Sequence, residues 1–198
     1  MTLRVGVCVS GRGTNLQAIL DACQSGQLDA RVVYVASSRK SAPALERAKA
    51  AGVPAEAFPP AANGGRDAAQ TLMAARFAAA EVDLVVLAGY DRILCDQFFA
   101  RLGDVPVINI HPALLPAFAG LNGMKVHEAV LAAGLAETGC TVHRAQAGEV
   151  DEGEILVQRR VPVLPGDDPE TLAARVLAEE HRALVDAVAL FVRPTVRA

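Results

Sequence analysis

The chain has 198 residues, of which 52% are hydrophobic and 21% are charged, and its formal net charge at pH 7 is −3. This composition is typical of one globular domain and excludes a disordered chain. The slightly acidic balance argues against a general nucleic-acid surface, which is normally basic. Apolar runs are shorter than the roughly 18 residues of a membrane span, and the first residues show no signal-peptide pattern. We therefore expect a cytoplasmic protein that binds neither nucleic acid nor a membrane.

The first half of the chain alternates short apolar runs with amphipathic stretches. Strands are predicted at residues 5–9, 31–36 and 82–88, with a weaker one at 53–58. Helices are predicted between them at residues 15–25, 42–51 and 66–80. This alternation predicts an α/β fold: a doubly wound, mostly parallel, Rossmann-like sheet with helices on both faces.

The second half has a more mixed pattern. A buried strand is predicted from 105 to 108, a helix at 125–133, and β-rich segments at 139–142 and 155–163. A last helix begins at Asp168, a good N-cap, with Pro169 at the first helical position. Its apolar stripe consists of Leu172, Val176, Leu184, Val188 and Phe191.

A glycine-rich loop, Ser10-Gly11-Arg12-Gly13-Thr14-Asn15, links the first predicted strand to the first helix. Glycines allow close backbone approach, and a helix N-terminus directs its N–H groups at an anion. The loop lacks the Gly-Lys-Ser/Thr of a P-loop, and Leu16 stands where the dinucleotide fingerprint has its third glycine. It fits one phosphate, with Thr14 and Asn15 adding side-chain donors, although a purely structural tight turn is the alternative.

Asn109 and His111 follow the apolar run at 105–108, and Pro112 stops the strand. Residues two apart on a strand point the same way, so the two side chains should project together. An amide that can donate to an oxyanion then lies beside an imidazole that titrates near neutrality. The alternative is a polar pair that only caps backbone groups.

Two acidic residues are harder to interpret. Asp151 lies in an acidic, glycine-rich turn, where it either forms the turn or orients a histidine. Glu180 lies in the middle of the apolar stripe of the last helix, so it must be paired, protonated or at the edge of a pocket. A structural partner such as an arginine and a ligand-facing role are both open.

The remaining histidines and the cysteines show no metal-ligand spacing. His127, His143 and His181 are interpreted as packing or surface histidines. The four cysteines are scattered without a CxxC motif, which predicts reduced thiols and no disulfide framework or zinc site. We therefore expect no metal.

Six segments are similar, in order, to those of one enzyme family: residues 10–17, 87–94, 109–116, 139–143, 150–155 and 179–181. On these segments, which extend over nearly the whole chain, it resembles the phosphoribosylglycinamide formyltransferases, folate-dependent enzymes of purine biosynthesis. The resemblance implies transfer of a formyl group from 10-formyltetrahydrofolate to the amine of 5′-phosphoribosylglycinamide, without a metal. It also implies one formyltransferase domain over 1–198, a monomer or homodimer, with a phosphate-binding half (1–100) and a catalytic and folate-binding half (101–198).

The same resemblance implies the roles of individual residues. The catalytic residues would be Asn109, His111 and Asp151. Formyl transfer also fits their chemistry: Asn109 and a protonated His111 can stabilise the oxyanion, and Asp151 can keep His111 charged or pass a proton through water. The substrate-binding residues would be Gly13, Thr14 and Asn15 at the phosphate and Glu180 at the glycinamide end. The folate site would be lined by Arg66, Arg92, Ile93, Leu94 and Asn109.

The chain departs from the common family pattern at four places. Asp91 stands where many members carry a methionine, and Arg144 where an aromatic or aliphatic residue is usual. The spacing from His143 to Asp151 is one residue longer than usual, and the link at 120–125 is also slightly long. The longer spacing affects the expected pterin contacts more than the role of Asp151.

Other functions remain as alternatives. A formyltetrahydrofolate hydrolase, or the formyl-transfer domain of a methionyl-tRNA formyltransferase, would share the Asn-x-His pair and the distal Asp. Both are disfavoured because no extra regulatory or tRNA-binding domain is recognised and because the anion loop suits a small phosphorylated acceptor. A nucleotide-binding Rossmann-like module is a more distant alternative, since the third glycine of its fingerprint is missing.

Overall fold

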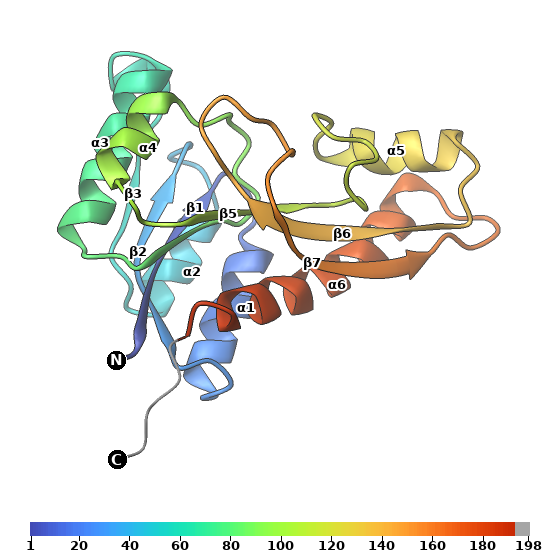
Figure 1. Ribbon diagram of the computed structural model, residues 1–198, viewed down its shortest axis with the longest axis horizontal. Helices are drawn as coiled ribbons and strands as arrows, with labels where there is room; N and C mark the ends of the chain where they lie inside the picture. Colours follow the sequence, from blue (N-terminus) through green and yellow to red (C-terminus); the bar gives the residue numbers. More distant parts are fainter. Residues whose placement is uncertain (193–198) are drawn as a thin grey trace.

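The computed structural model describes residues 1–192, which form a seven-stranded sheet flanked by helices (Figure 1). The strands are β1 (Leu3–Val9), β2 (Ala30–Ser37), β3 (Ala55–Ala57), β4 (Leu84–Leu87), β5 (Val107–His111), β6 (Glu137–Arg144) and β7 (Ile155–Pro162). The helices are α1 (Thr14–Gln24), α2 (Ala44–Ala50), α3 (Arg66–Ala79), α4 (Asp96–Leu102), α5 (Met124–Ala132) and α6 (Pro169–Ala189), with a 3₁₀ turn, η1 (Pro60–Ala62).

The strand order is β3-β2-β1-β4-β5-β6-β7. Neighbouring strands from β3 to β5 are parallel, whereas β6 pairs antiparallel with both β5 and β7. The predicted doubly wound, mostly parallel sheet is therefore confirmed. Because the order runs outward in both directions from β1 and β4, the switch point lies between these two strands, where ligands bind in such sheets.

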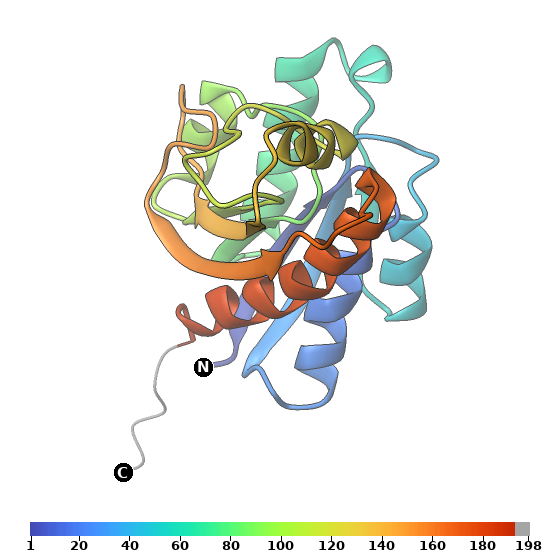
Figure 2. The same cartoon turned by 90° about the vertical axis from the view of Figure 1, so that its right-hand side faces the viewer.

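Helices cover both faces of the sheet. On one face Leu16 and Ile19 of α1 pack with Leu172 and Leu184 of α6 against the strands, and Figure 2 shows α6 running beside α1. On the other face the core contains Met73 and Phe77 of α3 and Phe98 of α4. The sheet is thus buried in its centre, and its functional groups must emerge at strand ends.

Three elements differ from the sequence prediction, one of them being β5, which ends at His111 and not at the predicted residue 108. Helix α4 was not predicted: only Phe98 and Leu102 of its seven residues are buried, and this one apolar pair is too short a pattern to recognise. Strand β6 extends beyond the predicted 139–142 because polar residues such as Thr138, Thr141 and His143 are buried within it. Polar residues break the apolar run on which a strand prediction depends.

The start of α6 is as predicted. The Asp168 side chain accepts a hydrogen bond from the Thr171 N–H at 2.8 Å, and the Thr171 hydroxyl accepts from the Asp168 N–H at 3.0 Å. This reciprocal pair and Pro169 fix where the helix begins. Helix α6 thereby presents its apolar stripe, with Glu180 within it, to the sheet and α1.

Candidate active site

Asn109 and His111 lie at the carboxyl end of β5, and the antiparallel pairing of β5 with β6 places a third polar residue beside them. In this register Asn109 lies opposite His143. The Asn109 Nδ2 atom is 3.1 Å from His143 Nε2, while His143 Nδ1 lies 2.9 Å from the backbone oxygen of Arg144. Since a carbonyl only accepts, His143 Nδ1 carries a hydrogen, and the ring is held at both nitrogens.

Asp151 joins this group from the loop between β6 and β7. Its Oδ2 atom is 3.2 Å from His111 Nδ1, and its Oδ1 atom is 3.3 Å from both His143 Nε2 and Asn109 Nδ2. The Gly120 N–H also donates to Oδ2, at 3.0 Å. Asn109, His111, His143 and Asp151 are called the catalytic cluster below. The three residues that sequence reasoning singled out are therefore brought together.

The backbone of Asp151 is itself unusual, with φ of 57°. Few non-glycine residues adopt this left-handed region, although aspartate is among those that do so more readily. The contacts of its carboxylate with β5, β6 and the Gly120 loop hold the residue there. Such a conformation is typical of functional positions whose surroundings over-determine them.

The charges of the cluster differ from the sequence-based expectation. Burial lowers the pKa of His111 below its usual value, and this outweighs the raising effect of Asp151. Burial opposes ionisation of Asp151, but its contacts with His143, the Gly120 N–H and His111 lower its pKa overall. A lowered pKa favours the neutral form of His111, beside an ionised Asp151. The carboxylate of Asp151 does raise the pKa of His111, as expected, but burial has the larger and opposite effect.

The orientation of His111 follows from these contacts. The carboxylate of Asp151 only accepts and its Oδ2 lies 3.2 Å from Nδ1, so this contact favours the neutral tautomer with its hydrogen on Nδ1. The other nitrogen, Nε2, is buried and has no hydrogen-bond partner among the described residues. A buried, unpaired nitrogen with a carboxylate at the opposite side of the ring is the arrangement of a general base.

His143 is the member of the cluster that sequence reasoning missed. It was interpreted as a packing or surface histidine, and it is buried, but it contacts both Asn109 and Asp151. Its position two residues beyond Thr141 in β6 gave no signal, because the register with β5 joins residues 34 apart in sequence. Only a prediction of strand pairing could have found it.

The glycine-rich loop connects β1 to α1 at the switch point. Gly13 has φ of 74°, and a Cβ there would lie 2.5 Å from the Cβ of Ala44, so only glycine fits. Thr14 begins α1, so the N–H groups of its first turn point to the loop. The loop therefore has the backbone geometry of an anion site, in agreement with its sequence.

Asn15 and Glu180 form a buried pair beside this loop. The Asn15 amide donates to Glu180 Oε2 at 2.8 Å, whereas Asn15 Oδ1 is buried without a partner among the described residues. Burial raises the pKa of Glu180, and the bond from Asn15 offsets this only in part. The partner that the sequence left open is thus an asparagine and not an arginine.

The residues expected at the folate site lie near one another. Gln70, on the same face of α3 as Arg66, donates to the backbone oxygen of Ile93 at 3.0 Å and accepts from the Cys95 N–H at 2.7 Å. Ile93 is 58% exposed and Leu94 is buried. Arg66 and Arg92 are exposed, and within residues 1–192 each forms an ion pair only with the neighbouring aspartate, Asp67 or Asp91.

Arg144 closes the base of the loop that carries Asp151. Its guanidinium bonds Glu154 at 2.7 Å and lies 5.4 Å from the centre of the Phe191 ring. The Gly153 position, where a Cβ would lie 1.9 Å from the Arg144 oxygen, requires a glycine. These contacts fix both ends of the lengthened loop.

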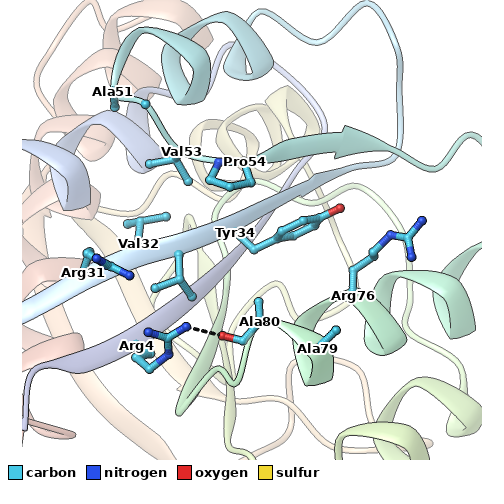
Figure 3. A pocket seen from close by; sticks show the side chains of 12 residues that line it. Arg4, Arg31, Val32, Tyr34, Ala51, Val53, Pro54, Arg76, Ala79 and Ala80 are labelled. Carbon is cyan, nitrogen blue, oxygen red and sulfur yellow. Dashed lines mark hydrogen bonds between the residues drawn. The ribbon is translucent and has the colours of Figure 1, made fainter.

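A pocket of about 540 Å³ lies at the opposite, amino ends of β1 and β2 (Figure 3). Its cationic side chains include Arg4, which donates to the Ala80 and Glu81 oxygens, and Arg76, which pairs with Glu56. These charges serve the packing of α3, and the catalytic cluster lies at the other end of the sheet. This pocket is therefore not the candidate active site.

Neither a metal site nor a membrane-spanning helix is found among residues 1–192. No group of three or more His, Cys, Asp or Glu side chains there is arranged to hold a metal ion. No helix in this range is long and apolar enough to cross a membrane.

Comparison with known proteins identifies the family. A family model described as formyl transferase matches residues 3–188. The chain belongs to the formyl transferase family. Phosphoribosylglycinamide formyltransferase of Mycobacterium tuberculosis is 46% identical over 186 residues, covering 94% of this chain and 83% of that protein. The crystal structure of glycinamide ribonucleotide transformylase 1 from Symbiobacterium toebii matches with a TM-score of 0.90 and 45% identity, covering 98% of this chain and 92% of that one.

Longer relatives contain a similar segment as a small part of their length. The trifunctional purine biosynthetic protein adenosine-3 of Drosophila pseudoobscura pseudoobscura is 41% identical over 196 residues. This match covers 98% of the chain but only 14% of that relative. The chain thus spans about a seventh of the length of this protein.

Proposed function

We propose that this chain is a phosphoribosylglycinamide formyltransferase: it moves the formyl group of 10-formyltetrahydrofolate to the amine of 5′-phosphoribosylglycinamide. The observation that carries the proposal is the contact of Asp151 with both His111 and Asn109 at the carboxyl end of β5. This arrangement supplies a base, an oxyanion donor and a carboxylate within one buried cluster. The names of the relatives given above support the choice of substrates.

The acceptor would bind between the glycine-rich loop and α6. We infer that Gly13, Thr14 and Asn15 hold its phosphate at the start of α1 and that Glu180 contacts its glycinamide end. Within residues 1–192 the buried Asn15 Oδ1 has no partner, and the buried carboxylate of Glu180 is bonded only by Asn15, so both could take a further polar partner, which supports this assignment.

The donor would bind on the other side of the cluster. Arg66 and Arg92 offer guanidinium groups for its carboxylates, Ile93 and Leu94 offer apolar contact, and Asn109 reaches its formyl oxygen. Ile93 is one of the more exposed large apolar residues, which supports a ligand contact there. In this arrangement the phosphate lies with residues 1–100 and the catalytic cluster with residues 101–198 of one domain.

The reaction begins when the neutral amine of the acceptor attacks the formyl carbon. A C–N bond forms, the carbonyl electrons move to oxygen, and the nitrogen becomes positive. Asn109 donates to this oxyanion, an interaction typically worth about 3 kcal/mol. His111 Nε2 takes the proton from the nitrogen, and Asp151 stabilises the imidazolium through Nδ1.

The second half of the reaction returns His111 to its starting state. The imidazolium gives its proton to N10 of the folate, the C–N10 bond breaks, and the oxyanion becomes the carbonyl of the new formamide. The products are formylglycinamide ribonucleotide and tetrahydrofolate. His111 is neutral at the start and at the end, which agrees with its lowered pKa in the free protein.

The experiment that tests the proposal follows folate absorbance when the purified chain meets 10-formyltetrahydrofolate with and without 5′-phosphoribosylglycinamide. Deformylation that requires the acceptor, with formylglycinamide ribonucleotide as product, is the expected result. Loss of the formyl group without the acceptor would indicate a hydrolase. No deformylation in either case would contradict the proposal.

A further inference from the structure

Asp91 lies in the segment that follows β4 and makes a set of contacts that the reaction above does not use. Its N–H donates to the Ser10 hydroxyl at 2.9 Å, and its Oδ1 accepts from the Ser38 hydroxyl at 3.0 Å. The two hydroxyl oxygens are 2.7 Å apart. Asp91 also pairs with the guanidinium of Arg39, and Arg92 lies 3.6 Å away.

The direction of each hydrogen bond in this group follows from these contacts. Burial alone would raise the pKa of Asp91, but the serine hydroxyls and Arg39 lower it overall, so the carboxylate is ionised and only accepts. The single hydroxyl hydrogen of Ser38 therefore goes to Asp91, and Ser10 must donate to Ser38. Ser10 in turn accepts from the Asp91 N–H.

The result is a closed circuit from the Asp91 N–H through Ser10 and Ser38 back to the Asp91 carboxylate. Ser10, Ser38 and Asp91 are called the serine ring below. Both serines are buried, with 5% and 2% of their surface exposed. Each hydroxyl donates once and accepts once, so the ring is internally satisfied and its geometry is fixed.

The serine ring connects the two loops that the proposed function assigns to the two substrates. Ser10 is the first residue of the glycine-rich loop, and Asp91 directly precedes the segment Arg92–Leu94. These loops leave β1 and β4, the adjacent strands at the switch point. The ring therefore connects the acceptor loop to the donor segment beyond the last register pair of β1 and β4, Cys8 and Leu87.

We propose that Asp91 is a positioning residue for the two-substrate reaction: through the serine ring it sets the distance between the acceptor loop and the donor segment. This inference rests on the proposed function. Asp91 touches neither substrate and acts through Ser10 and Arg92. A binding loop that is already held in place loses little freedom when its ligand binds, so this pre-organisation raises the affinity for both substrates.

The test compares Asp91→Ala, Asp91→Asn and Arg39→Ala in the full chain, with steady-state kinetics for both substrates. Asp91→Ala opens the ring, and we expect KM for both substrates to rise about five- to tenfold, the effect of losing one buried hydrogen bond, with kcat changing less. Asp91→Asn keeps an oxygen acceptor for Ser38 and should restore KM to within about twofold of the original value. Arg39→Ala removes the ion pair but leaves the ring, and should also remain within about twofold, as exposed ion pairs contribute little.

The matched control is Asp104→Ala, an exposed aspartate for which no side-chain hydrogen bond is formed within residues 1–192. Ser38→Ala, which removes only a hydroxyl, repeats the experiment if Asp91→Ala does not fold. A lower melting temperature or a smaller active fraction with unchanged KM would assign Asp91 a merely structural role and overturn the inference. Failure of Asn to rescue, with Arg39→Ala as defective as Asp91→Ala, would also overturn it.

The unaltered chain separates this inference from the proposed function. If it transfers no formyl group, the proposed function is overturned and the inference with it. If it is active and the variants deviate as described, only the inference is overturned.

Discussion

The catalytic cluster and the serine ring lie at the same edge of the sheet but are held in opposite ways. In the serine ring each hydroxyl donates and accepts within the group. In the catalytic cluster Nε2 of His111 has no partner among the described residues, and Asp151 holds a left-handed backbone conformation. A buried polar atom without a partner costs roughly 1–3 kcal/mol, so it persists only where something else requires it.

A buried ring nitrogen without a hydrogen-bond partner indicates a functional histidine only when a second feature accompanies it. His127 also has a buried ring nitrogen without a partner in the described part of the chain, yet no acidic side chain bonds its ring there. His111 combines the unpaired Nε2 with a carboxylate at Nδ1. We therefore propose that the serine ring positions the loops and that the catalytic cluster carries the chemistry.

The largest effect is expected from His111→Ala, which removes the base of the catalytic cluster. We expect kcat to fall roughly 10²- to 10⁴-fold, the range of general acid–base catalysis, with the circular dichroism spectrum retained. His127→Ala is the matched control, since it removes a buried histidine outside the cluster, and its kcat should remain within about threefold of the original. Equal losses in the two variants, or original rates in His111→Ala, would remove the distinction between the two histidines.

A smaller effect is expected from Asp151→Asn. Asparagine tolerates the positive φ at this position, so the loop should keep its conformation. We expect kcat to fall about 10- to 100-fold, because the imidazolium loses its stabilising charge.

The Asp151→Asn variant should also change the pH dependence of kcat/KM in a defined direction. The carboxylate of Asp151 raises the pKa of His111, so its removal lowers that pKa further. The neutral base then persists to lower pH, and the acidic limb of kcat/KM should shift to lower pH. Ionisation of the substrate amine would not shift with the variant. Glu152→Gln, a neighbouring exposed acid, should leave the limb in place, and an unmoved or raised limb in Asp151→Asn would argue against His111 as the base.

Much of the parallel half could be predicted from sequence because its signals are local. Strand β4 is a continuous apolar run, β1 is apolar from Val5 to Val9 with the glycine-rich loop next to it, and Asn109 directly follows the apolar start of β5. Asp151 was found only through the family resemblance, since its turn is compatible with any acidic loop.

What could not be predicted depends on pairing between distant residues. His143 joins the cluster through the β5–β6 register, and Glu180 meets Asn15 across 165 positions. The serine ring joins three strand ends and leaves no pattern in any one of them. The direction of the pKa shift of His111 could not be predicted, because burial, which has the largest effect on that pKa, is a property of the folded chain.

The smallest effect concerns Glu180→Gln, a variant that separates ligand binding from stability. Burial raises the pKa of Glu180 in the folded chain, so folding favours the protonated form. The stabilising contribution is present below the unfolded pKa of about 4.3 and is lost as pH rises through the raised folded value. Glutamine stays neutral at every pH, so the variant should melt at a higher temperature at pH 8, by about 2–4 °C for each kcal/mol gained, and gain less at pH 5.

The same substitution should weaken acceptor binding, because a neutral amide replaces the carboxylate that we place at the glycinamide end. We expect KM for the acceptor to rise about fivefold, as for one lost charge-assisted hydrogen bond, with KM for the donor unchanged. Glu179→Gln, the neighbouring acid that pairs with Arg159 and Arg182, should change neither quantity by much. If the variant gains stability at pH 8 without any change in KM, Glu180 is a buried structural acid and does not contact the acceptor.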